Sequence, residues 1–237
     1  MTQDLQLRVL EALQGAENYN RWLAELTRAH LGENPVEIGS GLGGNAALWL
    51  ELGVPRVTVS ELEPATLERL KRRFAGDQRV TVARIDLASP TPASHSSCVA
   101  LNVLEHIEDD VAALRGAARL VRPGGAVVMF VPAFEFATGR FDRAIGHFRR
   151  YTRASLVAAY ENAGLEVASS RYVNAPGLLA WFVSVRLLGQ TPREGTLLRL
   201  WDRGVIPLVR RGERRLSPPF GQSVLAVGYT AARRCRR

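Results

Sequence analysis

The sequence has few cysteines and no long apolar run. Its most hydrophobic stretch, residues 177–189, is well short of the roughly 20 residues that span a bilayer. Cys98 and Cys235 are the only cysteines, too few for a disulfide framework or a zinc site. No basic segment followed by an apolar one opens the chain, so no secretory signal is expected. We therefore expect a cytoplasmic protein, one that can still contact a membrane surface peripherally.

Low-complexity tracts and internal repeats are also missing. Of the 237 residues, 46% are hydrophobic and 23% are charged, values typical of ordinary globular proteins. A chain of this length commonly folds as one α/β unit with a well-buried core. The composition therefore excludes an intrinsically disordered chain and favours a single domain.

Positive charge is concentrated at one end of the chain. Residues 193–237 contain eleven arginines and three acidic residues, whereas the remainder is neutral overall and the chain carries a net charge of +8. Clustered cations attract nucleic acid phosphates, anionic lipids or phosphorylated substrates. They also occur on ordinary solvated surfaces. Charge alone therefore selects no partner.

Short apolar stretches alternate with amphipathic ones from residue 35 onward. Such alternation predicts a parallel sheet with helices on both faces. The expected strands are 35–39, 56–61, 79–84, 97–103 and 125–131, and the expected helices are 44–52, 64–74 and 109–120.

The two ends of the chain add further elements. Leu5, Val9 and Leu13, followed by Trp22 and Leu26, recur at helical spacing and predict an N-terminal helical cap. After the fifth strand we expect a long loop over 132–151, a helix over 153–162 and a strand over 165–173. Two inserted helices are expected within 176–211, before a last strand over 223–230.

A glycine-rich loop follows the first expected strand. Glycines allow the backbone to approach a ligand closely. Gly39, Gly41 and Gly44 fit a dinucleotide-binding pattern, whereas Glu37, Gly39, Gly41 and Gly43 fit a loop that binds S-adenosylmethionine. The glycines do not decide between the two cofactors, and a structural turn without a ligand is a third alternative.

Carboxylates follow the second and third expected strands. Glu61 lies about twenty residues beyond the glycine loop, where a carboxylate accepts hydrogen bonds from ribose hydroxyls. Its spacing favours it over Glu63. Asp86 is placed to accept from an adenine amino group, or alternatively to cap a helix or turn.

Four stretches in this order resemble the class I S-adenosylmethionine-dependent methyltransferases. They are residues 37–43 (EIGSGLG), 60–64 (SELEP), 102–107 (NVLEHI) and 121–125 (VRPGG). The resemblance covers nearly the whole chain. It implies a Rossmann-like seven-stranded sheet whose last strand is antiparallel, with helices on both faces.

The resemblance also assigns the binding of S-adenosylmethionine. The glycine loop would hold the methionine part, Glu61 the ribose and Asp86 the adenine, and residues 102–104 would line the methionine side. The predicted cofactor-binding residues are Glu37, Gly39, Ser40, Gly41, Gly43, Glu61, Leu62, Asp86, Leu87, Asn102, Val103 and Leu104.

Residues 141–152 (FDRAIGHFRRYT) and 18–22 (NYNRW) resemble a narrower bacterial subgroup of these enzymes with varied substrates. The loop after the fifth strand lies at the carboxyl edge of the sheet, where open α/β folds bind ligands. An imidazole there suits removal of a hydroxyl proton near neutral pH. His147 is therefore our candidate general base, and its alternative role is to order the loop.

Other candidates surround this histidine. The two arginines of the loop either bind an acidic group of the substrate or pair with carboxylates such as Asp142, and the aromatic residues of the cap either close over the site or belong to the core. The predicted catalytic residues are His147, Arg150 and Tyr151, and the predicted substrate-binding residues are Tyr19, Trp22 and Arg149.

A metal centre is the alternative for part of this set. Glu105 and His106, with His147, resemble the ligands of the small-RNA 2′-O-methyltransferases. Those enzymes have a second glutamate where this chain has Asn102. Magnesium prefers carboxylate oxygens, so the absence of the second glutamate lowers the affinity for this metal. We therefore expect no metal.

The sequence thus predicts one methyltransferase domain over 1–237. It is divided into a cap (1–33), a cofactor-binding core (34–173), a helical insert (174–212) and a last strand with a basic tail (213–237). The expected reaction is O-methylation of a small or a lipid- or sugar-linked acceptor, without specific binding of nucleic acid. The alternatives are an NAD-dependent oxidoreductase, a non-catalytic cofactor-binding partner protein and, with less support, an RNA methyltransferase.

Overall fold

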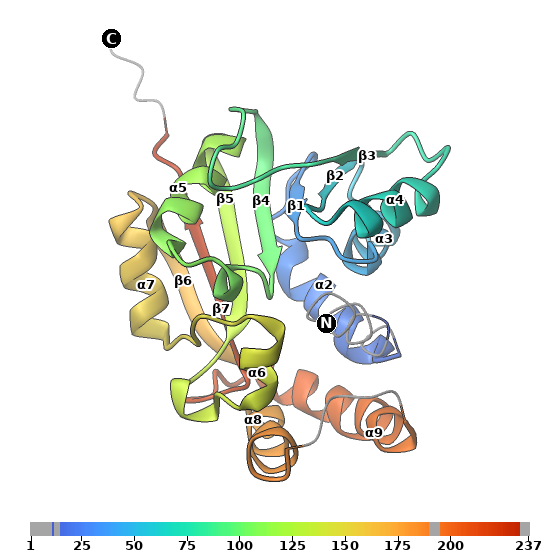
Figure 1. Cartoon of the computed structure of the whole chain (residues 1–237), viewed down its shortest axis with the longest axis vertical. Helices are drawn as coiled ribbons and strands as arrows, with labels where there is room; N and C mark the ends of the chain where they lie inside the picture. Colours follow the sequence, from blue (N-terminus) through green and yellow to red (C-terminus); the bar gives the residue numbers. More distant parts are fainter. Residues whose placement is uncertain (1–10, 12–14, 190–194, 233–237) are drawn as a thin grey trace.

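A single seven-stranded sheet organises the chain (Figure 1). The computed structural model describes residue 11 and residues 15–189 and 195–232. The strands are β1 (Val36–Ile38), β2 (Val57–Ser60), β3 (Val80–Ala83), β4 (His95–Leu101), β5 (Val121–Pro132), β6 (Glu166–Val173) and β7 (Ser223–Tyr229). Their order is β3-β2-β1-β4-β5-β7-β6, and β7 is antiparallel to both neighbours while β1 to β5 are mutually parallel. The predicted Rossmann-like sheet with an antiparallel last strand is confirmed.

Helices cover both faces of this sheet. One face carries α5 (Asp110–Leu120) and α7 (Arg153–Asn162), and the other carries α2 (Glu17–Arg28), α3 (Gly44–Glu51) and α4 (Pro64–Arg73) (Figure 1). The central strands divide their side chains between the two layers. Cys98 and Ala100 of β4 pack on the α5 side, whereas Val99 packs on the α3 side. This period of two, with apolar residues at successive positions 98–100, is typical of a strand that is buried on both faces.

The segment between β5 and α7 differs from the expected loop. It contains two short helices, η2 (Glu135–Ala137) and α6 (Arg140–Ile145). Asp142 accepts a hydrogen bond from the Gly139 backbone N–H at 2.7 Å, and Gly146 ends the helix with φ of 87°. A helix of this length is too short to show a hydrophobic period, so sequence periodicity missed it.

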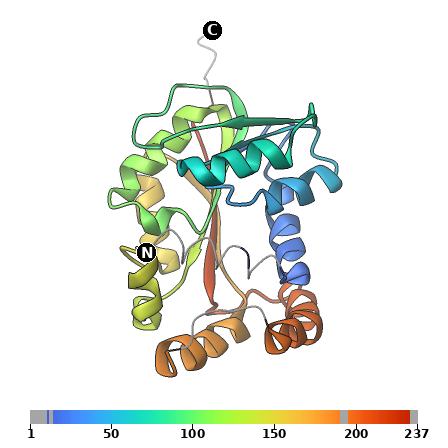
Figure 2. The same ribbon diagram turned by 45° about the vertical axis from the view of Figure 1, so that its right-hand side comes forward.

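The helical insert lies before β7, as predicted. It consists of α8 (Ala175–Trp181), the π-helical segment η3 (Phe182–Leu187) and α9 (Thr196–Glu213). Asp202 of α9 accepts hydrogen bonds from the backbone N–H groups of Asn18 and Tyr19, both at 2.9 Å, which joins α9 to α2. Figures 1 and 2 both show α8 and α9 at the same end of the molecule.

The expected N-terminal cap is described only in part. The helix α2 belongs to it, whereas Leu5, Val9 and Leu13 lie outside the described residues. Within the part of the chain that the structure describes, no helix combines the length and apolar character that crossing a bilayer requires.

Candidate active site

The glycine loop, residues 39–43, joins β1 to α3. Gly39, Gly41 and Gly43 have φ of 64°, 54° and 77°, a left-handed region that side chains other than glycine rarely adopt. A Cβ atom at Gly39 would lie 2.5 Å from Val103 Cγ2. A Cβ atom at Gly43 would lie 2.6 Å from Phe74 Cε2. The loop therefore requires glycine for its conformation and, at Gly39 and Gly43, also for close packing, whereas its approach to a cofactor stays a prediction.

Hydrogen bonds hold this loop against the end of β2. The Gly41 backbone N–H donates to Glu61 Oε1 at 2.6 Å. Ser40 Oγ accepts from the Ser60 N–H at 3.0 Å, and the Ser40 N–H donates to the Ser60 carbonyl at 2.9 Å. In the strand register Ile38 is opposite Ser60. The glycine loop and Glu61 are therefore adjacent at the carboxyl edge of the sheet, where sequence spacing placed them.

Glu37 is a buried carboxylate directly below the loop. It is 1% exposed, and Oε2 has no hydrogen-bond partner among the described residues. Burial raises the pKa of this carboxyl to about 8. An unpartnered buried oxygen is costly unless something satisfies it. Its position beside a backbone cradle therefore fits a polar, positively charged cofactor.

The remaining predicted cofactor residues are split between the surface and the core. Asp86 is exposed, and its Oδ1 accepts from the Ala88 N–H at 2.9 Å, so it does cap a turn. Leu62 is 44% exposed, whereas the side chains of Leu87 and Leu104 are buried in the core. Only the backbones of these two leucines remain candidates for cofactor contacts.

Asn102 and Val103 follow β4 at the same edge of the sheet. Asn102 is exposed with φ of 55°, and its N–H donates to the Phe130 carbonyl at 2.7 Å. Because Ile38 of β1 is opposite Ala100 of β4, this turn lies next to the glycine loop. The three turns that follow β1, β2 and β4 thus meet at one edge.

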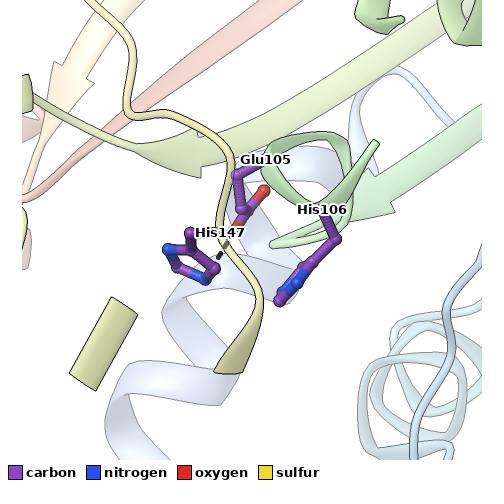
Figure 3. A group of neighbouring side chains, drawn as sticks. All are labelled: Glu105, His106 and His147. Atoms are coloured by element: carbon purple, nitrogen blue, oxygen red, sulfur yellow. Dashed lines mark ion pairs between the residues drawn. The ribbon is translucent and has the colours of Figure 1, made fainter. Parts of the chain in front are cut away.

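A cluster of ionisable side chains lies directly after this turn (Figure 3). Glu105 and His106 belong to the short helix η1 (Leu104–His106), and His147 approaches them from the segment after α6. His147 Nε2 lies 3.9 Å from Glu105 Oε1, and the two imidazole ring centroids are 4.6 Å apart at 82°. One ligand atom from each of these residues lies within 4.8 Å of the others.

Asp142 fixes the orientation of His147. Its Oδ1 lies 3.1 Å from His147 Nδ1 and 2.6 Å from an Arg150 guanidinium nitrogen. Burial by itself raises the pKa of Asp142, but hydrogen bonds from His147 and Arg150 outweigh it and hold the pKa at about 2. With Nδ1 engaged by an ionised carboxylate, Nε2 is the nitrogen left for chemistry. Sequence reasoning named Asp142 only as a partner for arginine and missed this role.

Glu105 is the unusual member of the cluster. It is fully buried, and neither carboxylate oxygen has a hydrogen-bond partner among the described residues. Burial raises its pKa to about 8, whereas burial and then His147 lower the pKa of His106 to about 4. A neutral imidazole and a hard oxygen donor are suitable ligands for a divalent cation. No feature of the sequence indicated that the Glu105 carboxylate would be buried without a hydrogen bond among the described residues.

Arg150 and Tyr151, for which we expected catalytic roles, have internal partners. Both are buried: Arg150 pairs with Asp142 and lies over the Trp181 ring, while the Tyr151 hydroxyl donates to Asp110 Oδ2 at 3.0 Å. Their polar groups already have partners inside the protein. These contacts favour a role in positioning the loop, and a direct catalytic role for either residue stays a prediction.

The predicted substrate residues have similar outcomes. Arg149 pairs with Asp110 at 3.0 Å and donates to the Glu108 carbonyl. Trp22 is 2% exposed within a core cluster, and partly buried Tyr19 packs against the same cluster, which favours the core alternative for both. The helical spacing of these aromatic residues is therefore explained by packing against the core.

The combined geometry defines a class of protein. A Rossmann-like sheet, a glycine cradle and an acidic residue after β2 form a site for a nucleoside cofactor. Residues 36–129 match the family model described as "Methyltransferase domain". These residues form a methyltransferase domain of the class I, S-adenosylmethionine-dependent type. The match favours the second of the two glycine patterns over the NAD-binding one.

Two curated relatives of this chain are O-methyltransferases by name. The chain is 28% identical over 160 residues to the ubiquinone biosynthesis O-methyltransferase of Xanthomonas euvesicatoria pv. vesicatoria (strain 85-10), a match that covers 60% of this chain and 66% of that protein. It thus spans just under two thirds of that relative's length. The enzyme of the same name from Xanthomonas campestris pv. campestris (strain B100) is 26% identical over 179 residues, covering 68% and 72%.

Solved structures share the fold. The geranyl diphosphate C-methyltransferase of Streptomyces coelicolor A3(2) aligns with a TM-score of 0.62 at 16% identity, covering 88% of this chain and 78% of that one. The [4+2]-cyclase SpnF aligns with a TM-score of 0.61 at 17% identity, covering 90% and 81%. Since a cyclase and a methyltransferase align equally well, this likeness supports the fold and not the reaction.

Proposed function

We propose that this enzyme transfers a methyl group from S-adenosylmethionine to a hydroxyl oxygen of a small-molecule acceptor, with His147 as the general base. The carrying observation is the Asp142–His147 pair, which sits beside the turn after β4 at the cofactor edge. The names of the curated relatives, which are O-methyltransferases, support oxygen as the methylated atom.

The chain supplies both positioning and proton removal. When bound, the cofactor supplies a methyl group on a sulfonium, which needs an in-line nucleophile. Backbone groups of residues 39–43 with Glu37 and Glu61 would hold it. His147 Nε2 then accepts the proton of the acceptor hydroxyl, and Asp142 stabilises the imidazolium that results.

We further propose an acceptor that carries a lipid or sugar-linked apolar part and meets the enzyme at a membrane surface. The support is the insert of α8, η3 and α9, which exposes several leucines beside arginines. An apolar segment flanked by basic residues suits an amphipathic substrate near a bilayer. The relatives' place in ubiquinone biosynthesis is consistent with an apolar acceptor.

A second candidate assigns His147 a different role in the same reaction. Glu105, His106 and His147 have the donor set and proximity of a divalent cation site, and Glu105 lacks other partners. A histidine ligand usually donates its other ring N–H to a carboxylate, as His147 can to Asp142. When bound, a cation would orient acceptor oxygens.

Single-turnover methyl transfer to hydroxylated aromatic acceptors separates the two. With His147 as base, His147→Ala lowers the rate by roughly 10² or more, donor affinity is unchanged, and neither a chelator nor Glu105→Gln has a large effect. With a cation site, chelation and Glu105→Gln both abolish turnover, and added Mg²⁺, Mn²⁺ or Zn²⁺ restores the chelated enzyme. Full activity of His147→Ala would contradict both.

Two rival functions have their own tests. A non-catalytic partner protein predicts tight donor binding but no transfer of labelled methyl from donor to any component of a cell extract. An RNA methyltransferase predicts RNA binding that is strongly salt-sensitive and is lost when residues 231–237 are deleted.

A further inference from the structure

The segment formed by α8 and η3 presents apolar side chains to solvent. Leu179, Val183 and Leu187 recur every four residues and are each more than half exposed, so they follow one another along one side of the segment. Leu188 continues the row and is equally exposed. Contiguous exposed apolar surface on a soluble fold marks a site of interaction.

The helix α9 packs Trp201, Ile206 and Val209 against the core and carries a second, exposed row of apolar side chains. Its inward side carries Asp202 and Ile206, both buried. Leu197, Leu200 and Leu208 lie on the opposite side and are 78%, 64% and 71% exposed. At 3.6 residues per turn, positions 197, 200 and 208 share one stripe. A helix of this kind normally directs its apolar stripe into the core.

Arginines accompany this stripe. Arg199, Arg203 and Arg211 are exposed, and none takes part in an ion pair recorded for the described residues. Arg210, by contrast, is engaged by Glu25 at 2.5 Å. The stripe is therefore bordered by positive charge without matching carboxylates, as in helices that lie in the interface of an anionic bilayer.

A cavity of about 420 Å³ opens between α6 and η3, beside the exposed leucines. Arg140, Arg143 and Arg186 contribute to its lining together with Leu187 and Leu188. Guanidinium groups bind phosphate oxygens in a fork geometry, and the leucines provide an apolar wall. The lining thus matches a phosphate group attached to a hydrocarbon chain.

We infer that η3, α9 and this cavity form a docking surface for a bilayer that contains anionic phospholipid, with a lipid phosphate bound among Arg140, Arg143 and Arg186. The α8–η3 and α9 helices share one end of the molecule in both views (Figures 1 and 2), so a single membrane plane can contact both. This inference rests on the membrane contact put forward above, whereas methyl transfer does not depend on it.

Vesicle cosedimentation of the full chain, without methyl donor, tests the surface. We expect binding to phosphatidylcholine vesicles that contain phosphatidylglycerol, weak binding to phosphatidylcholine alone, and a decrease with salt. Leu187→Glu with Leu200→Glu should lower the partition coefficient by at least about tenfold, since it places charges in the interface. Arg140→Gln with Arg143→Gln should lower it by roughly tenfold or more.

The matched control is Arg72→Gln with Arg119→Gln, which removes the same charge from exposed positions on α4 and α5. It should bind vesicles like the unaltered protein. Equal loss in the control would show unspecific charge attraction and overturn the site, as would absence of vesicle binding. A dimer in solution that the leucine variant converts to monomer would assign the surface to self-association instead. Donor binding in every variant reports folding and the proposed function separately.

Discussion

The ionisation of Glu37 provides the sharpest test of the cofactor site. The carboxyl is 1% exposed, and burial raises its pKa from 4.5 to about 8. In the unfolded chain the same group ionises near its ordinary pKa. Between these two values the folded protein binds one proton more than the unfolded chain, so the free energy of unfolding falls as pH rises.

The decrease in the free energy of unfolding follows from the interval between the two pKa values of Glu37. From 4.5 to about 8, at about 1.4 kcal/mol per pH unit, the decrease amounts to roughly 5 kcal/mol. The contribution of Glu37 is fully present below pH 4.5, falls through the interval and is lost above pH 8. Glu37→Gln has no proton to lose, so its stability should depend less on pH over the same range.

Denaturant unfolding at intervals from pH 5 to pH 9 measures the difference between the two proteins. The variant should gain several kcal/mol relative to the unaltered chain between the ends of this range, and the comparison cancels the contribution of Glu105. Superimposable pH dependences would refute the placement of Glu37 as a buried acid with one oxygen that lacks a hydrogen bond.

Donor binding gives an independent readout. A sulfonium cofactor favours the ionised carboxylate, so affinity for S-adenosylmethionine should rise with pH toward about 8 and binding should release a proton. Calorimetry in buffers of different ionisation enthalpy detects that proton. Glu37→Gln should bind more weakly and without proton release.

Three further predictions concern the loop and the histidine. Gly39→Ala should weaken donor binding and, because of the positive φ at this position, lower the free energy of unfolding by at least about 1–2 kcal/mol. Adding Val103→Ala should recover only the part of this loss that comes from the clash between the new Cβ and Val103. Thermal unfolding measures both changes. His147→Ala should lower kcat roughly 10²-fold with little change in donor Kd; an unaltered rate constant would leave it a structural role. Asp142→Asn should lower the free energy of unfolding by about 3–5 kcal/mol because Arg150 stays buried without its carboxylate partner. Denaturant titration measures this change, and an unchanged stability would contradict the importance of the pair.

The active-site cluster shows where sequence reasoning stopped. Residues 102–107 and His147 predict a functional site at this edge of the sheet, and their residue types also suggest the metal alternative. The sequence did not indicate that the Glu105 carboxylate would be buried without a hydrogen bond among the described residues, or that Asp142 would hold His147 by Nδ1. Both depend on how the segment after β5 folds back onto η1, which joins residues about forty positions apart.

The sequence by itself determined the alternating strands and helices of the sheet and the glycine loop, whereas the antiparallel direction of the last strand followed only from the family resemblance. These features depend on local signals: alternating apolar stretches, turn residues, and glycines whose positive φ few other residues tolerate. Only the tertiary structure decided which side chains face inward. Trp22 lies in the core, Arg150 pairs with the buried Asp142, Tyr151 donates to the partly buried Asp110, and Leu197, Leu200 and Leu208 of α9 face outward. The direction of a side chain depends on packing between distant elements, and periodicity along one helix does not encode which face its neighbours cover.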